Sequence, residues 1–229
     1  MQLSANLVEG RFITRLNRFA AMVEVEGQEV MVHVANSGRL GELLVPGYRM
    51  MLKPSSGDHR KTHFDLALVD LGLTLCSADA RLPSSLLAEA LAEARVPEFR
   101  DYTTIRREVT YKESRLDLLL QGESGPCFVE TKSVTLVENG LALFPDAPTL
   151  RGVKHLRSLT DARKNGYRSA VVFVIQRDDA EAFSPHDVAD PEFGLTLRSS
   201  VAAGVEAFAY CCRVTEKEIE LTRRVPVKL

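Results

Sequence analysis

The sequence contains no tryptophan, and only 7% of its 229 residues are aromatic. Its four cysteines form no C-x-x-C pair, and the adjacent Cys211 and Cys212 are poorly placed for a disulfide or a zinc site. No apolar run approaches the roughly 18–20 residues that span a bilayer, and no secretory signal is visible at the N-terminus. We therefore expect a cytoplasmic protein with reduced, mostly buried thiols, without a structural zinc ion and without contact to a membrane.

The chain also lacks an excess of either charge. It carries 29 Lys and Arg against 31 Asp and Glu, a formal net charge of −2. Residues 1–80 hold 8 basic and 9 acidic side chains, which leaves 21 and 22 for residues 81–229. Any surface that binds nucleic acid must therefore be local. With 45% hydrophobic residues, the chain is long enough for one or two domains with packed cores.

The first 80 residues have the pattern of short β-strands. Apolar and polar residues alternate at 23–26 and 30–34, and Gly27 lies in the turn between these segments. Further strands are expected at 11–16, 48–52 and 63–69. Five short strands of this kind favour a small barrel such as an OB-fold, a fold that often binds nucleic acid. A purely structural barrel remains equally open on the pattern alone.

The composition changes near residue 80, where helices begin to alternate with strands. The spacing predicts a helix over 84–95, capped by Ser84 or Ser85 and ended by Pro97. The expected order then continues with strands at 105–111, 115–120 and 127–132, a helix at 149–165, a buried strand at 170–176, a helix at 193–203 and a last strand at 205–211. This order predicts an α/β domain, α+β overall, in which helices cover a mixed sheet.

The segment SRLDLLLQGESGPCFVETK at 114–132 reads as two strands around a glycine-containing turn. Folding this hairpin can bring Asp117 and Glu130 together, and Lys132 points the same way as Glu130. Paired carboxylates repel each other unless a cation lies between them, and oxygen ligands suit Mg²⁺ or Mn²⁺. The spacing resembles the PD-(D/E)XK pattern of nucleases. The alternative is a pair of solvated strands with a surface ion pair.

Two helices flank this hairpin in the sequence. Glu89 lies at the flank of the apolar stripe of the first helix, where it could face the acids or solvent. On the second helix Arg151, Lys154 and His155 share one face, and residues 146–168 carry six Lys and Arg against two Asp. Such a face could hold phosphates, although most charged helix faces are simply solvated. Asp146 could cap this helix or act as a third acid near a metal ion.

Other classes of site have little support. The sequence contains neither a G-x-x-x-x-G-K-[ST] phosphate loop nor a G-x-S-x-G nucleophile elbow. A P-loop nucleotide-binding protein and a serine hydrolase are therefore disfavoured.

Long stretches of the chain resemble one known family, the sugar fermentation stimulation protein A family. They are EGRFITRLNRF at 9–19, SRLDLLL at 114–120, VETKSVTL at 129–136, FPDAPTLRGVKHL at 144–156 and FSPHDVADPEF at 183–193. The resemblance implies a DNA-binding protein with an N-terminal OB-fold and a C-terminal PD-(D/E)XK nuclease-like domain. The chain departs from the family pattern mainly in its N-terminal half, and Ser84 stands where the family tends to have asparagine.

These observations predict an OB-fold-like domain at 1–80 and a nuclease-like domain at 81–229 that together bind double-stranded DNA. By the resemblance, Asp117 and Glu130 would hold Mg²⁺ or Mn²⁺ with help from Glu89, and Lys132 would orient the attacking water. The phosphate-binding candidates are Arg115, Arg151, Lys154 and His155, and Asp146 is a further site candidate. The competing hypothesis is a non-catalytic regulator of sugar metabolism genes on a nuclease-like fold. A homodimer is compatible with the sequence, which shows no coiled-coil signal.

Overall fold

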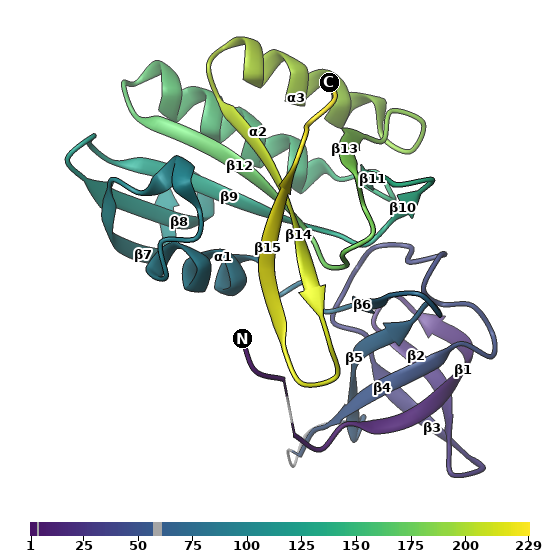
Figure 1. Cartoon of the computed structure of the whole chain (residues 1–229). Coiled ribbons are helices and arrows are strands. Elements are labelled where there is room, and N and C mark those ends of the chain that lie inside the picture. The colour runs from purple at the N-terminus through teal and green to yellow at the C-terminus, as the bar shows by residue number, and fades with distance from the viewer. Residues whose placement is uncertain (4, 57–60) are drawn as a thin grey trace.

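The computed structural model describes residues 1–3, 5–56 and 61–229. The chain forms a small β-barrel followed by a mixed sheet with helices on both faces (Figure 1). Both parts agree with the fold class expected from the sequence. None of the helices in the described ranges has the length and apolar character needed to cross a membrane.

The barrel is built from β1 to β5, with β6 as a short sixth strand. Antiparallel pairing runs in the order β3-β2-β1-β4-β5-β6, and a parallel contact between β3 and β5 closes the barrel. This closure gives the OB-fold topology and removes the exposed edges of the sheet. The strands are β1 (Val8–Asn17), β2 (Ala20–Val25), β3 (Gln28–His33), β4 (Arg49–Pro54), β5 (Phe64–Asp70) and β6 (Leu75–Ser77).

The predicted turn between β2 and β3 is confirmed. Val25 pairs with Gln28, so the hairpin loop has two residues, and both Glu26 and Gly27 have positive φ angles of 51° and 77°. This is the geometry that two-residue hairpins require, and glycine adopts it without steric cost. The barrel core collects the inward-facing apolar side chains of these strands and of the segment after β3, including Leu40 and Leu43.

The second domain contains a six-stranded sheet in the order β15-β14-β12-β9-β8-β7. The contacts of β12 with β9 and β14 are parallel, and the outer pairs are antiparallel. A small separate sheet has the order β10-β11-β13. The strands are β7 (Tyr102–Tyr111), β8 (Ser114–Gly122), β9 (Cys127–Val134), β10 (Val137–Glu138), β11 (Leu141–Phe144), β12 (Arg168–Ile175), β13 (Ala182–Pro185), β14 (Glu206–Val214) and β15 (Ile219–Val225).

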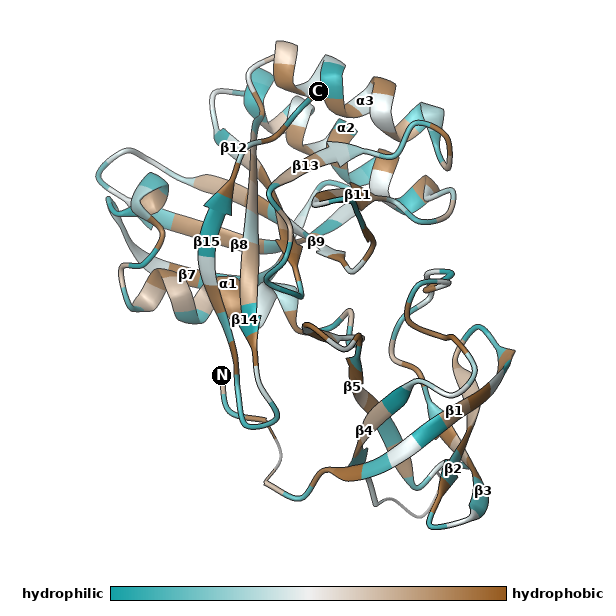
Figure 2. Ribbon diagram, turned by 45° about the vertical axis from the view of Figure 1, so that its right-hand side comes forward, coloured by the Kyte–Doolittle hydropathy of each residue, from teal (hydrophilic) through white to brown (hydrophobic). Residues whose placement is uncertain are grey.

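Helices cover the two faces of the six-stranded sheet. Helix α1 (Pro83–Ala92) packs on one face, and α2 (Leu150–Lys164) and α3 (Pro191–Ala202) pack on the other. Successive residues of β12 alternate between the two cores, which explains why its β-branched run is buried on both sides. Hydrophobic residues accordingly line the central strands in Figure 2.

The start of α1 differs from the prediction. The N-cap is Leu82, which makes no side-chain cap, and Pro83 occupies the first turn. Proline begins helices well because its missing N–H is unpaired there anyway and its φ angle is already helical. The hydroxyl groups of Ser84 and Ser85 instead accept hydrogen bonds from Arg107 on β7, at 3.2 and 2.7 Å.

The two domains meet along a polar seam. The backbone N–H of Ser77 donates to Gln176 O, and Thr135 Oγ1 donates to Glu42 Oε1 at 2.8 Å. The first residues of the chain lie against the second domain, where the N–H of Leu3 donates to Lys217 O.

Candidate active site between the domains

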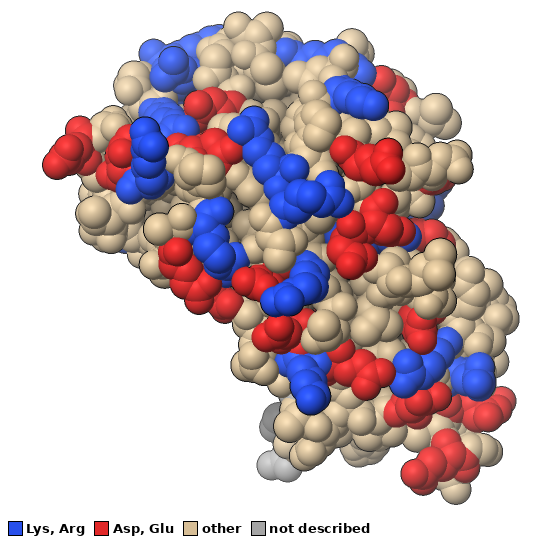
Figure 3. Space-filling view, viewed as in Figure 1, with Lys and Arg blue, Asp and Glu red and all other residues tan. Residues whose placement is uncertain are grey.

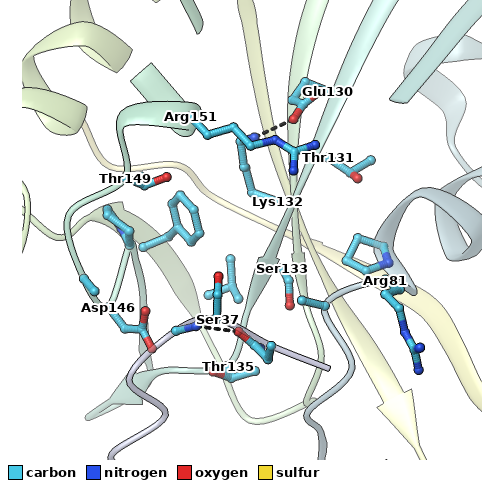
Figure 4. A pocket seen from close by; sticks show the side chains of 18 of the residues that line it. Ser37, Arg81, Glu130, Thr131, Lys132, Ser133, Thr135, Asp146, Thr149 and Arg151 are labelled. Carbon is cyan, nitrogen blue, oxygen red and sulfur yellow. Dashed lines mark hydrogen bonds and ion pairs between the residues drawn. The ribbon is translucent and has the colours of Figure 1, made fainter. Parts of the chain in front are cut away.

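A cavity of about 490 Å³ lies between the barrel and the second domain. Its lining comes from β8 and β9, from the start of α1, from the segment between β11 and α2, and from the barrel segment after β3. Figure 4 shows that Glu130, Lys132 and Arg151 approach the cavity from one end, whereas Ser37 and Asp146 lie at the other. Among the predicted site residues, Asp117, Glu130, Lys132, Asp146 and Arg151 line it.

Strands β8 and β9 separate where the acids lie. Their ladder runs from Leu120 and Cys127 to the pair of Leu118 with Val129, so Asp117 and Glu130 are the next residues in register. Asp117 Oδ2 accepts hydrogen bonds from Thr131 N at 2.7 Å and from Thr131 Oγ1 at 2.5 Å. Where the β8–β9 ladder ends, the Asp117 side chain therefore accepts from Thr131 N in place of a backbone carbonyl.

Near Asp117, the side chains of strands β7 and β8 switch from one face of the sheet to the other. Leu116 packs in the core beneath α2, whereas Leu118, two residues later, packs beneath α1. In a regular strand these residues would share a face. On β7 the same change separates Ile105 from Val109, and Glu108 between them has a φ of 55°. Side chains therefore do not alternate regularly around Asp117, and the distortion resembles the bulges that redirect side chains beside active sites.

Glu130 is the most buried acid of the cavity, with 3% of its surface exposed. Its Oε1 accepts a hydrogen bond from Lys132 Nζ at 2.5 Å and contacts His155 Nδ1. Its Oε2 is buried and has no hydrogen-bond partner among the described residues. Burying a carboxylate oxygen without a hydrogen-bond partner costs folding free energy. Glu130 Oε2 is therefore an atom that a bound ligand would satisfy.

The two acids differ in their proton affinity. Burial raises the pKa of Asp117, and the nearby Glu130 raises it further, against the hydrogen bonds from Thr131. Burial also acts to raise the pKa of Glu130, but the charge of Lys132 and the contacts with His155 outweigh it, so this pKa lies below its ordinary value. Glu130 is thus held as a carboxylate beside a second acid that resists ionisation without a cation.

The donor set fits a hard divalent cation. Asp117 and Glu130 provide carboxylate oxygens, and one of these is the orphaned Oε2. Within the described ranges, no three His, Cys, Asp or Glu side chains are grouped as metal ligands. The protein would therefore supply two carboxylates, with water and substrate oxygens completing the shell, which is the usual arrangement for Mg²⁺.

The start of α2 brings Arg151 to the cavity. Thr149 caps this helix by accepting from Gly152 N at 3.1 Å. The carboxylate of Asp190 accepts from Thr149 N at 2.8 Å and from Phe193 N at 3.0 Å, so one side chain ties the start of α2 to the start of α3. Beneath them, Phe173 stacks on Phe183 with ring centroids 3.9 Å apart.

The remaining residues of the predicted basic face have other roles. His155 is 5% exposed and lies behind Glu130, so it contacts the acid and not the cavity surface. Lys154 Nζ donates to Glu113 O at 3.0 Å, away from the lining. The structure therefore separates the three residues of the predicted face, because the turn of α2 directs His155 into the core. Phosphate binding by Arg151 and Lys154 stays a prediction.

Glu89 and Arg115 also lie outside the cavity lining. Glu89 Oε1 pairs with the Met1 amino group at 2.5 Å, on the side of α1 that faces β15. Arg115 is exposed and pairs with Glu108. The structure therefore corrects the expectation that Glu89 joins Asp117 and Glu130, because its rotation about α1 points it to the N-terminus.

Sequence reasoning missed several residues of the cavity, among them Thr131, Arg107 and Ser37. Thr131 lies between the acid and the lysine of the E-x-K motif, and alternation placed it on the opposite face. Arg107 and Ser37 come from β7 and from the barrel segment after β3. No local pattern distinguishes these two residues, because only the packing of one domain on the other brings them to the acids.

Comparison with known proteins agrees with this architecture. Residues 13–77 match the family model described as the SfsA N-terminal OB domain, and residues 81–218 match that of the sugar fermentation stimulation protein RE domain. The chain belongs to the sugar fermentation stimulation protein family. The expected family is confirmed, and so is the expected order of an OB-fold domain followed by a mixed sheet with helices.

Relatives in this family cover the whole length of the chain. The sugar fermentation stimulation protein homolog of Moorella thermoacetica is 47% identical over 232 residues, covering 100% of both chains. That of Desulforamulus reducens is 46% identical over 223 residues, covering 97% of this chain and 93% of its own. The solved structure of Pyrococcus furiosus SfsA in complex with Ca²⁺ is 30% identical, with a TM-score of 0.92 over 100% of this chain and 98% of that one.

Proposed function

We propose that this member of the sugar fermentation stimulation protein family is a divalent-cation-dependent nuclease that binds DNA in the cavity between its domains. The observation that carries the proposal is the buried Glu130 Oε2, which has no partner among the described residues and lies beside Asp117 and Lys132. The solved Pyrococcus furiosus relative is a complex with Ca²⁺, which supports a cation-binding role for the equivalent fold here.

Asp117 and Glu130 would hold Mg²⁺ or Mn²⁺ through their carboxylate oxygens. The bound cation would polarise a phosphate oxygen and lower the pKa of a bound water. His155 would keep the Glu130 carboxylate oriented through its Nδ1 contact. Thr131 would do the same for Asp117 with two hydrogen bonds to Oδ2.

Lys132 would bind the reacting groups directly. Its Nζ donates to Glu130 Oε1 and keeps further N–H groups that can reach an attacking water or a phosphate oxygen. Because Lys132 is largely buried beside the acid, its charge acts in a low dielectric and stabilises developing negative charge more strongly than an exposed lysine could.

Two arginines would bind the phosphates beside the scissile bond. Arg107 and Arg151 line the cavity, and neither has a carboxylate partner among the described residues. Many other basic side chains are paired, such as Arg213 with Glu220 and Arg224 with Glu98. On the face seen in Figure 3, basic and acidic residues are interspersed. The unpaired cations of the cavity therefore favour it as the place where a phosphate backbone binds.

The experiment combines cation binding with cleavage. Calorimetry with Mg²⁺ and Mn²⁺ on the wild type and on Glu130→Gln should show binding that disappears in the variant. A labelled duplex should be cut by the wild type in the presence of cation and left intact by Glu130→Gln. Glu89→Gln is the matched control, because it removes a carboxylate from the same domain outside the cavity, and it should retain both properties.

The outcomes separate the two hypotheses for this family member. Cleavage that survives in Glu130→Gln would refute the assigned site. Duplex binding by the wild type without cation binding or cleavage would instead identify a non-catalytic DNA-binding protein.

A further inference from the structure

The barrel segment that follows β3 reaches into the cavity. Residues 36–40, here called the barrel loop, contribute Asn36, Ser37, Gly38 and Leu40 to the lining. Ser37 is exposed, and in Figure 4 it lies across the cavity from Lys132 and Arg151. The loop therefore forms a wall opposite the groups assigned to the phosphate.

Asp146 holds this loop from the nuclease-like domain. Its Oδ2 accepts a hydrogen bond from the backbone N–H of Leu40 at 2.9 Å. Leu40 has a φ of 53°, in the left-handed region that a bulky side chain rarely adopts, and its side chain is buried in the barrel core. Such a conformation persists only where the surroundings fix it, and the Asp146 carboxylate is one of those surroundings.

Gly38 permits the close approach of the same carboxylate. A Cβ atom at this position would lie 2.6 Å from Asp146 Oδ2 and 2.8 Å from Oδ1. No real Cβ atom tolerates such distances, so an alanine would force the loop and Asp146 apart. The contact between the domains at this point thus depends on the absence of one methyl group.

The barrel braces the loop from the other side. The Arg15 guanidinium donates to Arg39 O at 2.5 Å and contacts Asn36 O at 3.5 Å. The Asn36 side chain accepts from Gly38 N at 2.9 Å and donates to Ala78 O at 3.2 Å. These hydrogen bonds hold the loop to its own domain, and the contact with Asp146 joins it to the segment that leads into α2.

We propose that Asp146 is a positioning residue that fixes the barrel loop as the second wall of the active site, where the exposed Ser37 hydroxyl donates a hydrogen bond to the substrate strand. This deepens the proposed function and rests on it. Asp146 precedes Arg151 by five residues on the segment that leads into α2, so one segment places both the loop and a phosphate-binding arginine. The barrel would thereby take part in the site itself.

Four variants test the proposal. Asp146→Asn keeps an oxygen that can accept from Leu40 N, whereas Asp146→Ala removes it. Gly38→Ala pushes the loop away, and the double variant Gly38→Ala with Asp146→Ala removes the group against which the new methyl collides. Amide hydrogen exchange at Leu40 reports the loop without cation or DNA. Fluorescence anisotropy of a labelled duplex in the presence of Ca²⁺ measures the affinity for DNA. Calorimetry with Ca²⁺ measures cation binding by Asp117 and Glu130.

We expect faster Leu40 amide exchange and about tenfold weaker duplex binding in Asp146→Ala and in Gly38→Ala. A tenfold change in affinity corresponds to the loss of about one hydrogen bond. Asp146→Asn should stay within about twofold of the wild type, and the double variant should be no worse than Asp146→Ala alone. Ca²⁺ affinity should be unchanged in all four variants.

Unchanged Leu40 exchange in Asp146→Ala would overturn the proposal. So would loss of Ca²⁺ binding in Asp146→Asn, which would make Asp146 a cation ligand. If the wild type bound no duplex, the proposed function would fail, and the exchange measurement would still decide whether Asp146 positions the loop.

Discussion

Replacement of Lys132 by methionine tests the charge balance on which the acid pair depends. Methionine has a similar length and removes only the ammonium group, which lies 2.5 Å from Glu130 Oε1. The Lys132 side chain is 10% exposed and that of Glu130 is 4% exposed, so both charges are shielded from water. Removing one partner of a buried ion pair costs about 3–5 kcal/mol, because the remaining charge is left without compensation.

We expect the lower end of that range for Lys132→Met, about 3 kcal/mol, because His155 keeps its contact with Glu130. For a chain of this length, about 3 kcal/mol corresponds to a melting temperature lowered by roughly 6–12 °C. Calorimetry in a buffer with EDTA measures this shift without any contribution from a bound cation.

Lys154→Met is the matched control for this experiment. Lys154 lies on the same helix as His155, is exposed, and donates to a single backbone carbonyl. Its replacement should change the stability by less than about 0.5 kcal/mol. Equal melting temperatures for Lys132→Met and Lys154→Met would refute the reasoning, because they would show that Glu130 does not depend on the lysine charge.

Three further substitutions test how the site is supported. Asp190→Ala should lower the free energy of unfolding by about 2 kcal/mol, because its carboxylate caps two helices, and should weaken duplex binding by displacing Arg151. A change below about 0.5 kcal/mol in urea unfolding would contradict this. Gly152→Ala should destabilise by about 1–3 kcal/mol in thermal denaturation, because its Cβ would lie 2.7 Å from Thr149 Cγ2, and stabilisation through helix propensity would refute the clash. Phe173→Ala should cost about 3–5 kcal/mol in urea unfolding, whereas the exposed Leu150→Ala should have little effect.

Local patterns in the sequence predicted most of the fold. Strands β1 to β5 of the barrel, the three helices and the buried strand β12 follow from alternation, caps and β-branched runs. Strand β15 was missed because Arg223 and Arg224 interrupt the apolar pattern of its segment IELTRRV. The short strands β6, β10, β11 and β13 carry too few residues for a period. The start of α1 was misread because two serines suggested a cap, although Pro83 precedes them.

The site was predictable only where it is local. The hairpin spacing predicted that Asp117, Glu130 and Lys132 lie together, and all three line the same cavity. Glu89 was misplaced because a residue at the flank of an apolar stripe can turn to either side, and the partner that decides is the distant Met1 amino group. Ser37 and Arg107 depend on contacts between segments far apart in the chain, which no periodicity encodes.

The shared change of face in β7 and β8 limits how these proteins can vary in length. Glu108 and Asp117 are opposite one another in the register, and their strands are joined by a turn of two residues, Lys112 and Glu113. An insertion of one residue in this turn would slide one strand past the other, and the distorted position on β7 would no longer face the one on β8. Such an insertion would also exchange the side chains that reach the two cores. Natural variation in length should therefore gather in the surface loops and spare this hairpin, which makes its two-residue turn a marker of members that keep the acids in this arrangement.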